Sequence, residues 1–457
     1  MMRYLPHTED EITEMLKVIG ADSVDALFDA SIPEAARLGR PLDVGAPLDE
    51  PAIMRHLERL AAANNGAAMT SFLGAGAYEH HVPPAVDQLL LRSEFYTAYT
   101  PYQPEVAQGT LQGIFEYQTI VSELLGLPLA NASMYDGASA TAEAVLMARR
   151  LTKRDEVLLS ESVHPEYREV VITYLRSIGA GHHIRTVPIG ADGLDDTAAL
   201  AAATTDRTAV VVLGYPSFFG TVSDVRAVVK AAHDKGALVV TATSEPYALA
   251  LLESPGALEV DIAVGEGQPL ATPPQFGGPG VGLFACRETR ETLQQIPGRL
   301  CGQTVDKDGK TAYVLTLVTR EQFIRRERAT SNICTNQGLL ALALTIRVAM
   351  LGKRGFVETA TQCLAKSEYL KEAIVKIPGF SLVYPSARTF NEFAIRIANG
   401  TAEALIERVA KHGFLGGYDL GRSFPDRKDQ LLLAVTEKHT RADLDGFLAA
   451  LVAPKPA

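Results

Sequence analysis

The sequence predicts an α/β protein with a largely parallel central sheet, a helical arm before it and a smaller α+β domain after it. Three observations predict this fold. The first 65 residues show only helical periodicity. Between residues 105 and 285, continuous apolar runs alternate with helical patterns, which is typical of strands covered on both faces. Beyond about residue 330, two helical patterns are followed by strand patterns. We therefore predict an arm at 1–95, a large domain at 96–330 and a small domain at 331–457.

The arm carries clear helix signals. Thr8 and Glu11 have the spacing of a capping box, in which each residue's side chain bonds the other's backbone N–H. Apolar residues then recur at helical spacing until Gly20, which suits a helix end. Asp49 and Pro51 open a second helical pattern. Helices without strands indicate an extended arm rather than a compact domain.

The two domains that follow are predicted from the length and period of their apolar segments. Because parallel sheets bind ligands at the carboxyl ends of their strands, we expect binding residues just after these strands. In the large domain the expected helices are 105–125, one after 137, 165–178 and 223–235, and the expected strands are 157–159, 209–213, 238–242, 262–264 and 281–285. In the small domain the expected helices are 336–351, 354–376, 401–412 and one capped at 440, and the strands are 381–383, 392–397 and 431–435.

Composition excludes several classes of protein. The chain has 457 residues, too many for one simple core, and a net charge of −11 argues against a nucleic-acid partner. No apolar run reaches the roughly 18 residues that span a bilayer, so we expect no membrane segment. The acidic start after Thr8 is unlike a signal peptide, which predicts a cytoplasmic protein.

The cysteines and histidines do not form a metal motif. Four cysteines occur without a Cys-x-x-Cys spacing, so neither a zinc site nor a disulfide framework is indicated. His80 and His81 are adjacent, and neighbouring side chains on an extended chain point apart. We therefore predict no metal.

Several motifs combine glycine, proline and aromatic residues in a specific order. They are Gly74–Tyr78 leading to His81–Pro84, Tyr99–Glu105, Phe115–Thr119, Asn131–Ser139, Gly265–Leu270, Phe276–Pro279 and Ala329–Thr335. Together they resemble the P-protein of the glycine cleavage system, a family with the fold of type I pyridoxal-phosphate (PLP) transferases. The resemblance covers essentially the whole chain. The length is about half that of the single-chain P-protein, so the chain is similar to one subunit of the split form.

The resemblance implies an activity and partners. A homologous second subunit holds PLP, and the two chains are expected to form an α2β2 assembly. Together they decarboxylate glycine, release CO2 and pass the aminomethyl group to the lipoyl arm of H-protein. PLP is then bound by the partner and not covalently by this chain. The expected enzyme is an aminomethyl-transferring glycine dehydrogenase.

The cofactor residues themselves are missing from this chain. No lysine lies between Lys235 and Lys307. The resemblance places Ala242 where the family has the aspartate that pairs with the pyridine nitrogen. It places Pro269, just after Gln268, where the family has the cofactor lysine. Proline has no amine for a Schiff base, and alanine cannot keep the pyridine nitrogen protonated. We therefore expect no autonomous catalytic residue and a vestigial cofactor pocket.

The loop beginning at Tyr99 is the best candidate for a wall of the partner's active site. Tyrosine and glutamine offer donors for a small carboxylate, and Pro101 and Pro104 stiffen the loop. The alternative is a rigid loop whose tyrosines fill core space. The predicted wall residues are Tyr99, Thr100, Pro101, Tyr102, Gln103 and Glu105.

Two further groups are candidates. The N-terminus of the helix that begins at Gly137 has free N–H groups, which suit a phosphate. The resemblance implies a cofactor pocket there, which is vestigial in this chain. The alternatives are an ordinary capped helix beside the remnant site and, for His164, a polar loop residue. The segment before residue 336 is expected at the subunit interface, or as a helix cap. The pocket candidates are Gly137, Ser139, Thr141, His164 and Gln268, and the interface candidates are Thr330, Ser331 and Asn332.

Two other functions are consistent with these observations. The chain could be a non-catalytic scaffold that only stabilises the partner subunit or docks H-protein. It could also be an independent PLP enzyme that uses a lysine elsewhere, although Lys230, Lys235, Lys307 and Lys310 do not follow a strand end.

Overall fold

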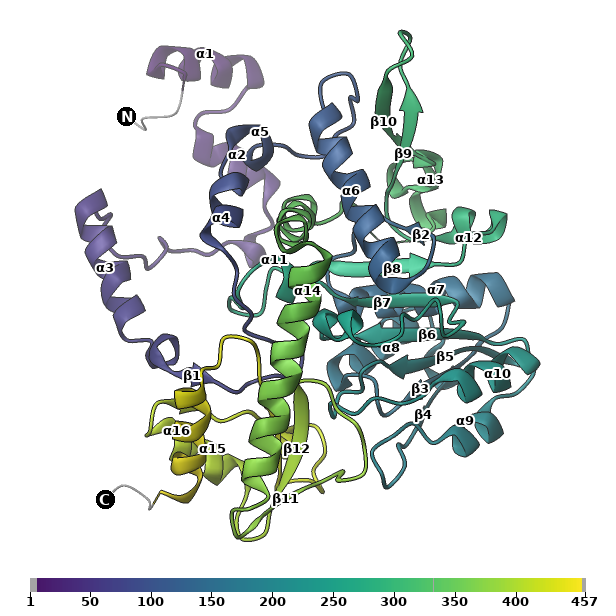
Figure 1. The fold of residues 1–457 in the computed structure, drawn as a ribbon. Coiled ribbons are helices and arrows are strands. Elements are labelled where there is room, and N and C mark those ends of the chain that lie inside the picture. The colour runs from purple at the N-terminus through teal and green to yellow at the C-terminus, as the bar shows by residue number, and fades with distance from the viewer. Residues whose placement is uncertain (1–5, 332, 454–457) are drawn as a thin grey trace. The chain divides into compact units, whose positions relative to one another are not determined.

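The computed structural model describes residues 6–331 and 333–453 (Figure 1). Contacts within the chain define two compact units, one ending at Asn65 and the other beginning at Gly66. No helix in the described ranges is long and apolar enough to cross a membrane. The predicted boundaries at 95/96 and 330/331 stay predictions.

The first unit consists of short helices, α1 (Glu9–Ile19), α2 (Val24–Ser31) and α3 (Glu50–Ala62). The predicted capping box is present, because Thr8 and Glu11 bond each other's backbone N–H. Gly20 ends α1 in the left-handed conformation, with φ of 80°. None of residues 6–65 is buried in the isolated chain. The apolar faces of these helices therefore lack a core of their own.

The second unit is built around a seven-stranded sheet in the order β2-β8-β7-β6-β5-β3-β4. Strands β4, β3, β5, β6 and β7 are parallel, whereas β8 is antiparallel to β7 and β2 is antiparallel to β8. The predicted α/β fold with a largely parallel sheet is confirmed. The strands are β2 (Leu129–Ala130), β3 (Glu156–Ser160), β4 (Ile184–Val187), β5 (Thr208–Gly214), β6 (Leu238–Thr243), β7 (Ile262–Glu266) and β8 (Gly282–Cys286).

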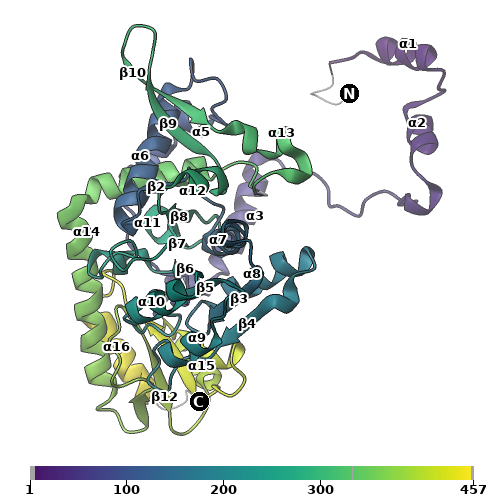
Figure 2. The same ribbon diagram turned by 90° about the vertical axis from the view of Figure 1, so that its right-hand side faces the viewer.

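Helices cover both faces of this sheet, which explains the continuous apolar runs. Along β5, Val210 and Val212 face a core shared with α7 and α8, whereas Val211 and Leu213 face a core shared with α6, α10 and α14. Figure 2 shows α14 and α7 on opposite sides of the sheet. The helices are α6 (Gln108–Leu125), α7 (Gly137–Thr152), α8 (Pro165–Ser177), α10 (Arg226–Asp234) and α14 (Gly338–Ile374), with the short α4 (Pro84–Leu90), α5 (Ser93–Tyr96), α9 (Thr197–Ala203), α11 (Gln268–Ala271), α12 (Arg290–Gln295) and α13 (Gln322–Arg325).

A smaller antiparallel sheet, in the order β11-β12-β15-β14, follows α14. The two helices predicted at 336–351 and 354–376 are both present and together carry the label α14; they are separated by a kink at Gly352, whose φ of 59° and ψ of 177° are not helical. Strand β1 (Thr70–Ser71) pairs with β13 (Phe414–Leu415), so the segment after the first unit joins the C-terminal part of the chain. The remaining elements are β11 (Phe380–Leu382), β12 (Glu392–Ile397), α15 (Ala402–Ala410), β14 (Tyr418–Asp419), β15 (Gln430–Ala434) and α16 (Arg441–Val452).

Two features differ from the sequence prediction. Helix α6 begins at Gln108 rather than at 105, because Pro104 starts a turn in which the N–H of Ala107 bonds the Pro104 carbonyl. An antiparallel hairpin of β9 (Leu300–Val305) and β10 (Thr311–Thr316) was not predicted. Its strands mix polar and apolar residues without a buried run, so the apolar pattern did not mark them.

Candidate functional site

A cavity of about 440 Å³ lies at the carboxyl ends of the sheet strands. It is lined by residues that directly follow β3 and end β7, where a doubly covered sheet is expected to bind ligands. Asp136 lies at the N-terminus of α7, His164 at that of α8, and Glu266 at the end of β7. Gln268 and the turn 274–280 complete the lining. Of the five residues predicted for a vestigial pocket, His164 and Gln268 line this cavity, whereas Gly137, Ser139 and Thr141 are not among its lining residues.

The N-terminus of α7 is capped by its own residues. Asp136 Oδ1 accepts the N–H of Ser139 at 2.7 Å, and Ser139 Oγ accepts the N–H of Asp136 at 3.2 Å. The hydroxyl of Thr141 donates to the carbonyl of Gly137 at 2.7 Å. These contacts agree with the alternative interpretation, in which Gly137, Ser139 and Thr141 belong to an ordinary capped helix beside the pocket.

The side chain of Glu266 accepts the one further N–H group at the N-terminus of α7 that an anion would use, that of Gly137. Its Oε2 accepts the N–H of Gly137 at 2.9 Å, and its Oε1 accepts the N–H groups of Gln268 at 2.9 Å and Val281 at 3.0 Å. Burial raises the pKa of Glu266 to about 7, although these three donors favour the charged form. A side-chain carboxylate thus lies where a phosphate group would need the same N–H donors.

His164 and Gln268 line the cavity, but their side-chain polar atoms form hydrogen bonds with the backbone of this chain. His164 Nε2 lies 2.8 Å from the carbonyl of Ala75, and its Nδ1 accepts the N–H of Glu166 at 3.2 Å. Burial lowers the pKa of His164, so the neutral ring is favoured. The side-chain amide of Gln268 donates to the carbonyl of Thr272.

The residues of this cavity do not fit PLP. No lysine and no arginine is found among the described residues that line it, whereas three carboxylates are: Asp136, Glu166 and Glu266. Ala242 is buried in β6 and Pro269 is buried in α11, and neither offers a polar side chain. The described lining has no amine for a Schiff base, and the carboxyl group of Glu266 already accepts the N–H donors that a phosphate would need. No step of a reaction is assigned to this cavity.

The predicted wall loop is largely exposed. Tyr99 is 77% exposed and Tyr102 is 55% exposed, so the alternative in which these tyrosines fill core space is wrong. Gln103 and Glu105 are also exposed, whereas Pro101 is buried. The loop is anchored to the interior by Arg299, whose buried guanidinium donates hydrogen bonds to Thr100, Tyr102 and Thr335.

The predicted interface segment lies beside this loop. The N–H of Thr330 donates to the carbonyl of Arg320 at 3.2 Å, and Ser331 Oγ accepts the N–H of Gly298 at 3.3 Å. Asn332 lies outside the described residues. Thr335 follows on the same segment and shares the Arg299 guanidinium with Thr100. Thr100 of the predicted wall loop and Thr335, the last residue of the motif Ala329–Thr335, therefore both bond Arg299.

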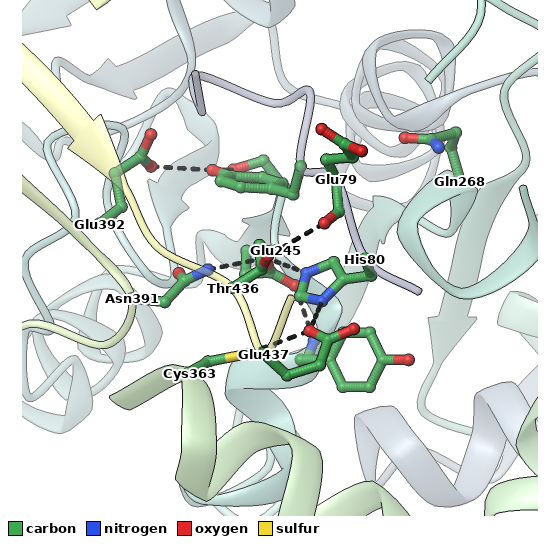
Figure 3. A network of polar contacts seen from close by, with 12 residues as sticks. Glu79, His80, Glu245, Gln268, Cys363, Asn391, Glu392, Thr436 and Glu437 are labelled. Carbon is green, nitrogen blue, oxygen red and sulfur yellow. Dashed lines mark hydrogen bonds and ion pairs between the residues drawn. The ribbon is translucent and has the colours of Figure 1, made fainter. Parts of the chain in front are cut away.

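A second polar cluster surrounds His80, and the sequence did not predict it. Figure 3 shows the His80 ring between the carboxylates of Glu245 and Glu437, with Asn391 and Cys363 beside them. Its Nε2 lies 2.8 Å from Glu245 and its Nδ1 lies 2.6 Å from Glu437. Burial opposes the charge, but the two carboxylates raise the pKa of His80 well above its usual value. The hydrogen bond from His80 lowers the pKa of Glu437 to about 2, against the effect of burial.

The neighbouring pair Tyr78 and Glu392 is also buried. The Tyr78 hydroxyl donates to Glu392 at 2.8 Å, and the N–H of Ala75 donates to the same carboxyl group at 2.6 Å. Burial raises the pKa of Glu392 to about 8 despite both donors. The segment 74–80 is therefore tied to both β12 and the residues after β15.

The only described group of residues that could hold a metal pairs His80 with Cys363 and Glu437, not with His81. His80, Cys363 and Glu437 bring donor atoms within 4.8 Å of one another, whereas the adjacent His81 is exposed. Both ring nitrogens of His80 already have carboxylate partners, so the cluster is satisfied as an ion triad. The expectation of no metal stays a prediction.

Comparison with known proteins agrees with this fold. Among solved structures, a sphingosine-1-phosphate lyase from Burkholderia pseudomallei (TM-score 0.66, 15% identity, 92% of this chain and 93% of that chain) and a cysteine desulfurase from Escherichia coli (TM-score 0.62, 17% identity, 89% and 98%) share the fold. A glycine decarboxylase (P-protein) crystal structure, in inhibitor-bound form, matches with a TM-score of 0.87 and 43% identity over 98% of this chain and 99% of that chain. The fold is therefore that of the type I PLP-dependent enzymes.

The sequence comparisons name the family. The family model "Glycine cleavage system P-protein" matches residues 2–451. A Sorangium cellulosum protein, "Probable glycine dehydrogenase (decarboxylating) subunit 1", is 62% identical over 456 residues, which is 100% of both chains. A protein of the same description from Desulforamulus reducens is 46% identical over 451 residues, covering 98% of this chain and 99% of that protein. The chain belongs to the glycine cleavage system P-protein family, and the resemblance found in the sequence is confirmed, including its likeness to one subunit of the split form.

Sequence reasoning missed the residues that organise the site. Glu266 carried a usable signal, because a carboxylate ends an otherwise apolar strand. His80 and Arg299 carried none, because their partners are distant in sequence: His80 and Glu437 are 357 residues apart, and Arg299 and Tyr102 are 197 apart.

Proposed function

We propose that this chain is the subunit of a two-subunit glycine decarboxylase that does not bind PLP. A homologous partner holds the cofactor, and this chain forms one wall of the partner's active site in an α2β2 assembly in the cytoplasm. The substrates are glycine and the lipoyl arm of H-protein. The observation that carries the proposal is the Glu266 carboxylate at the N-terminus of α7, in a cavity without a described lysine or arginine.

The proposal assigns limited chemistry to this chain. PLP on the partner supplies the electron sink for the loss of CO2. The residues of this chain bind, orient and exclude water, and a closed apolar surface strengthens each polar contact made inside it. The wall residues are Tyr99, Thr100, Pro101, Tyr102, Gln103 and Glu105. Tyr102 is the best placed of them, because its side chain is exposed and carries a hydroxyl donor suited to a small carboxylate.

The second candidate function is a scaffold that stabilises the partner or docks H-protein. It is favoured by the same cavity, since a chain without a cofactor needs no catalytic contact. The two candidates differ in what the loop 99–105 does once the chains are assembled. A wall residue affects the catalytic rate, whereas a scaffold residue affects only assembly or the affinity for H-protein.

Replacing Tyr102 with phenylalanine in the assembled enzyme is expected to lower turnover about 10- to 100-fold. A hydrogen bond to a charged group is worth about 1.5–3 kcal/mol, and each 1.4 kcal/mol corresponds to about a factor of 10 in rate. The measurement is CO2 release from carboxyl-labelled glycine with lipoylated H-protein, alongside the assembly equilibrium. Tyr96→Phe is the matched control, because Tyr96 is 63% exposed just before the loop. An unchanged rate with weaker H-protein binding would favour the scaffold.

A further inference from the structure

Arg299 is a buried cation whose partners are on the exposed loop. It is 3% exposed and precedes β9. Its Nη1 donates to Thr100 Oγ1 at 3.0 Å and to Thr335 Oγ1 at 2.8 Å, and its Nη2 donates to the Tyr102 hydroxyl at 3.0 Å. Its Nε pairs with Glu321 at 3.3 Å. One guanidinium therefore links three segments of the chain that carry Thr100 and Tyr102, Glu321, and Thr335.

The direction of the bond to Tyr102 determines what that hydroxyl can do. A guanidinium has no acceptor, so the phenol oxygen accepts from Arg299. The phenol hydrogen is then left for another partner, and within residues 6–331 and 333–453 no acceptor for it is found. Donation from a cation also polarises the phenol and makes it a better donor. Tyr102 is thus prepared to donate a hydrogen bond outward, to an acceptor that this chain does not supply.

Arg299 also fixes the orientation of the Tyr102 ring. The guanidinium carbon lies 5.3 Å from the centre of that ring, and Phe323 meets the ring edge-on at 6.3 Å. The hydroxyl oxygens of Thr100 and Thr335 lie 3.2 Å apart, at hydrogen-bond distance, so the loop is also linked to the segment that carries Thr335. An exposed side chain held in one orientation loses less freedom when it binds, so the contact is stronger.

The charge of Arg299 is not itself offered to a ligand. Glu321 neutralises it, and the side chain is covered by the loop it holds. The group available to a ligand is the Tyr102 hydroxyl, a donor that suits one oxygen of an anion. Arg299 therefore acts through Tyr102.

We propose that Arg299 is a positioning residue that sets the Tyr102 hydroxyl as a donor to an oxyanion in the partner's active site. This rests on the proposed function, which brings the loop to that site. The oxyanion is a carboxylate or phosphate oxygen, from glycine or from the partner's cofactor. A glycine contact appears in the KM for glycine, and a cofactor contact appears in the affinity of the assembled enzyme for PLP.

The test combines Arg299→Lys, Tyr102→Phe and the double variant in the assembled enzyme. Lysine keeps the charge but loses the fork that reaches the threonines and the tyrosine together. Each single variant is expected to lower kcat/KM for glycine, or PLP affinity, about 10-fold, and the double variant is expected to lose little more. Arg441→Lys is the control, because Arg441 is 69% exposed on α16. Additive losses of about 100-fold, or an Arg299→Lys variant that behaves like the control, would overturn the inference.

A second measurement separates this inference from the proposed function. Hydrogen exchange of the chain alone reports the order of the loop without any partner. Arg299→Lys is expected to speed exchange of the Tyr102 N–H, which bonds the carbonyl of Thr100 at 2.9 Å. Unchanged exchange would overturn the positioning role. Faster exchange with normal turnover in both Arg299→Lys and Tyr102→Phe would instead show that Arg299 orders the loop but that the loop is no wall of the active site, which contradicts the proposed function and the oxyanion contact.

Discussion

Replacing His80 with alanine is expected to lower the free energy of unfolding of the second unit by about 3–5 kcal/mol, the range for breaking a buried ion pair. The ring is fully buried between Glu245 and Glu437, at 2.8 Å and 2.6 Å. Without it, two carboxylates remain in a poorly hydrated site without their cation. The measurement is urea unfolding of the isolated chain. The unfolding free energies of the variant and the unmodified chain are compared with one common value for their dependence on urea concentration.

The neighbouring histidine provides the control for this prediction. His81 is exposed and only its backbone N–H bonds Glu437, so His81→Ala is expected to change stability by less than about 0.5 kcal/mol. The His80 effect also has a pH signature. Because the folded pKa of Glu437 is lowered to about 2, its contribution is present above its usual pKa and is lost as the pH falls toward 2. A His80→Ala variant as stable as His81→Ala would contradict the account of the ion triad.

Removing the arm is expected to abolish assembly with the partner subunit. No residue between 6 and 65 is buried, and apolar side chains such as Val18 (89% exposed), Val44 (74%) and Phe28 (57%) have no core of their own. So small a segment without a core gains stability only by covering another surface. Burying one phenylalanine contributes about 1.5–3 kcal/mol, so Phe28→Asp alone should weaken assembly about 10- to 100-fold.

The assembly equilibrium is measured by analytical ultracentrifugation with the PLP-bearing partner. Asp25→Asn, on the same helix α2, tests whether a change of charge alone is enough. We expect that variant to assemble normally. If the truncated chain assembles with undiminished affinity, the arm covers a surface of its own chain and the prediction fails.

The parts of the fold that could be predicted are those with local causes. Strand β5 is apolar at nearly every position because helices cover both its faces, and the Thr8–Glu11 box lies within four residues. The hairpin β9–β10 was not predicted, because its residues mix polar and apolar types. The two helices predicted at 336–351 and 354–376 are present as the two halves of α14, separated by the kink at Gly352.

The candidate site was predictable where a motif is continuous along the chain. The loop from Tyr99 and the helix start at Gly137 were selected in this way. The side chains that organise these segments could not be found, because their partners come together only in three dimensions. Arg299 reaches Tyr102 across 197 residues, and Glu266 reaches Gly137 across 129. No spacing rule connects such pairs.

The central claim is that the cofactor of the assembled enzyme is held by the partner and not by this chain. The most direct test is borohydride reduction of the assembled enzyme loaded with PLP, followed by peptide mass spectrometry of both subunits. The account predicts a stoichiometric pyridoxyl-lysine at one position of the partner and no specific adduct between residues 1 and 457 of this chain. A stoichiometric adduct at a single lysine of this chain would contradict it.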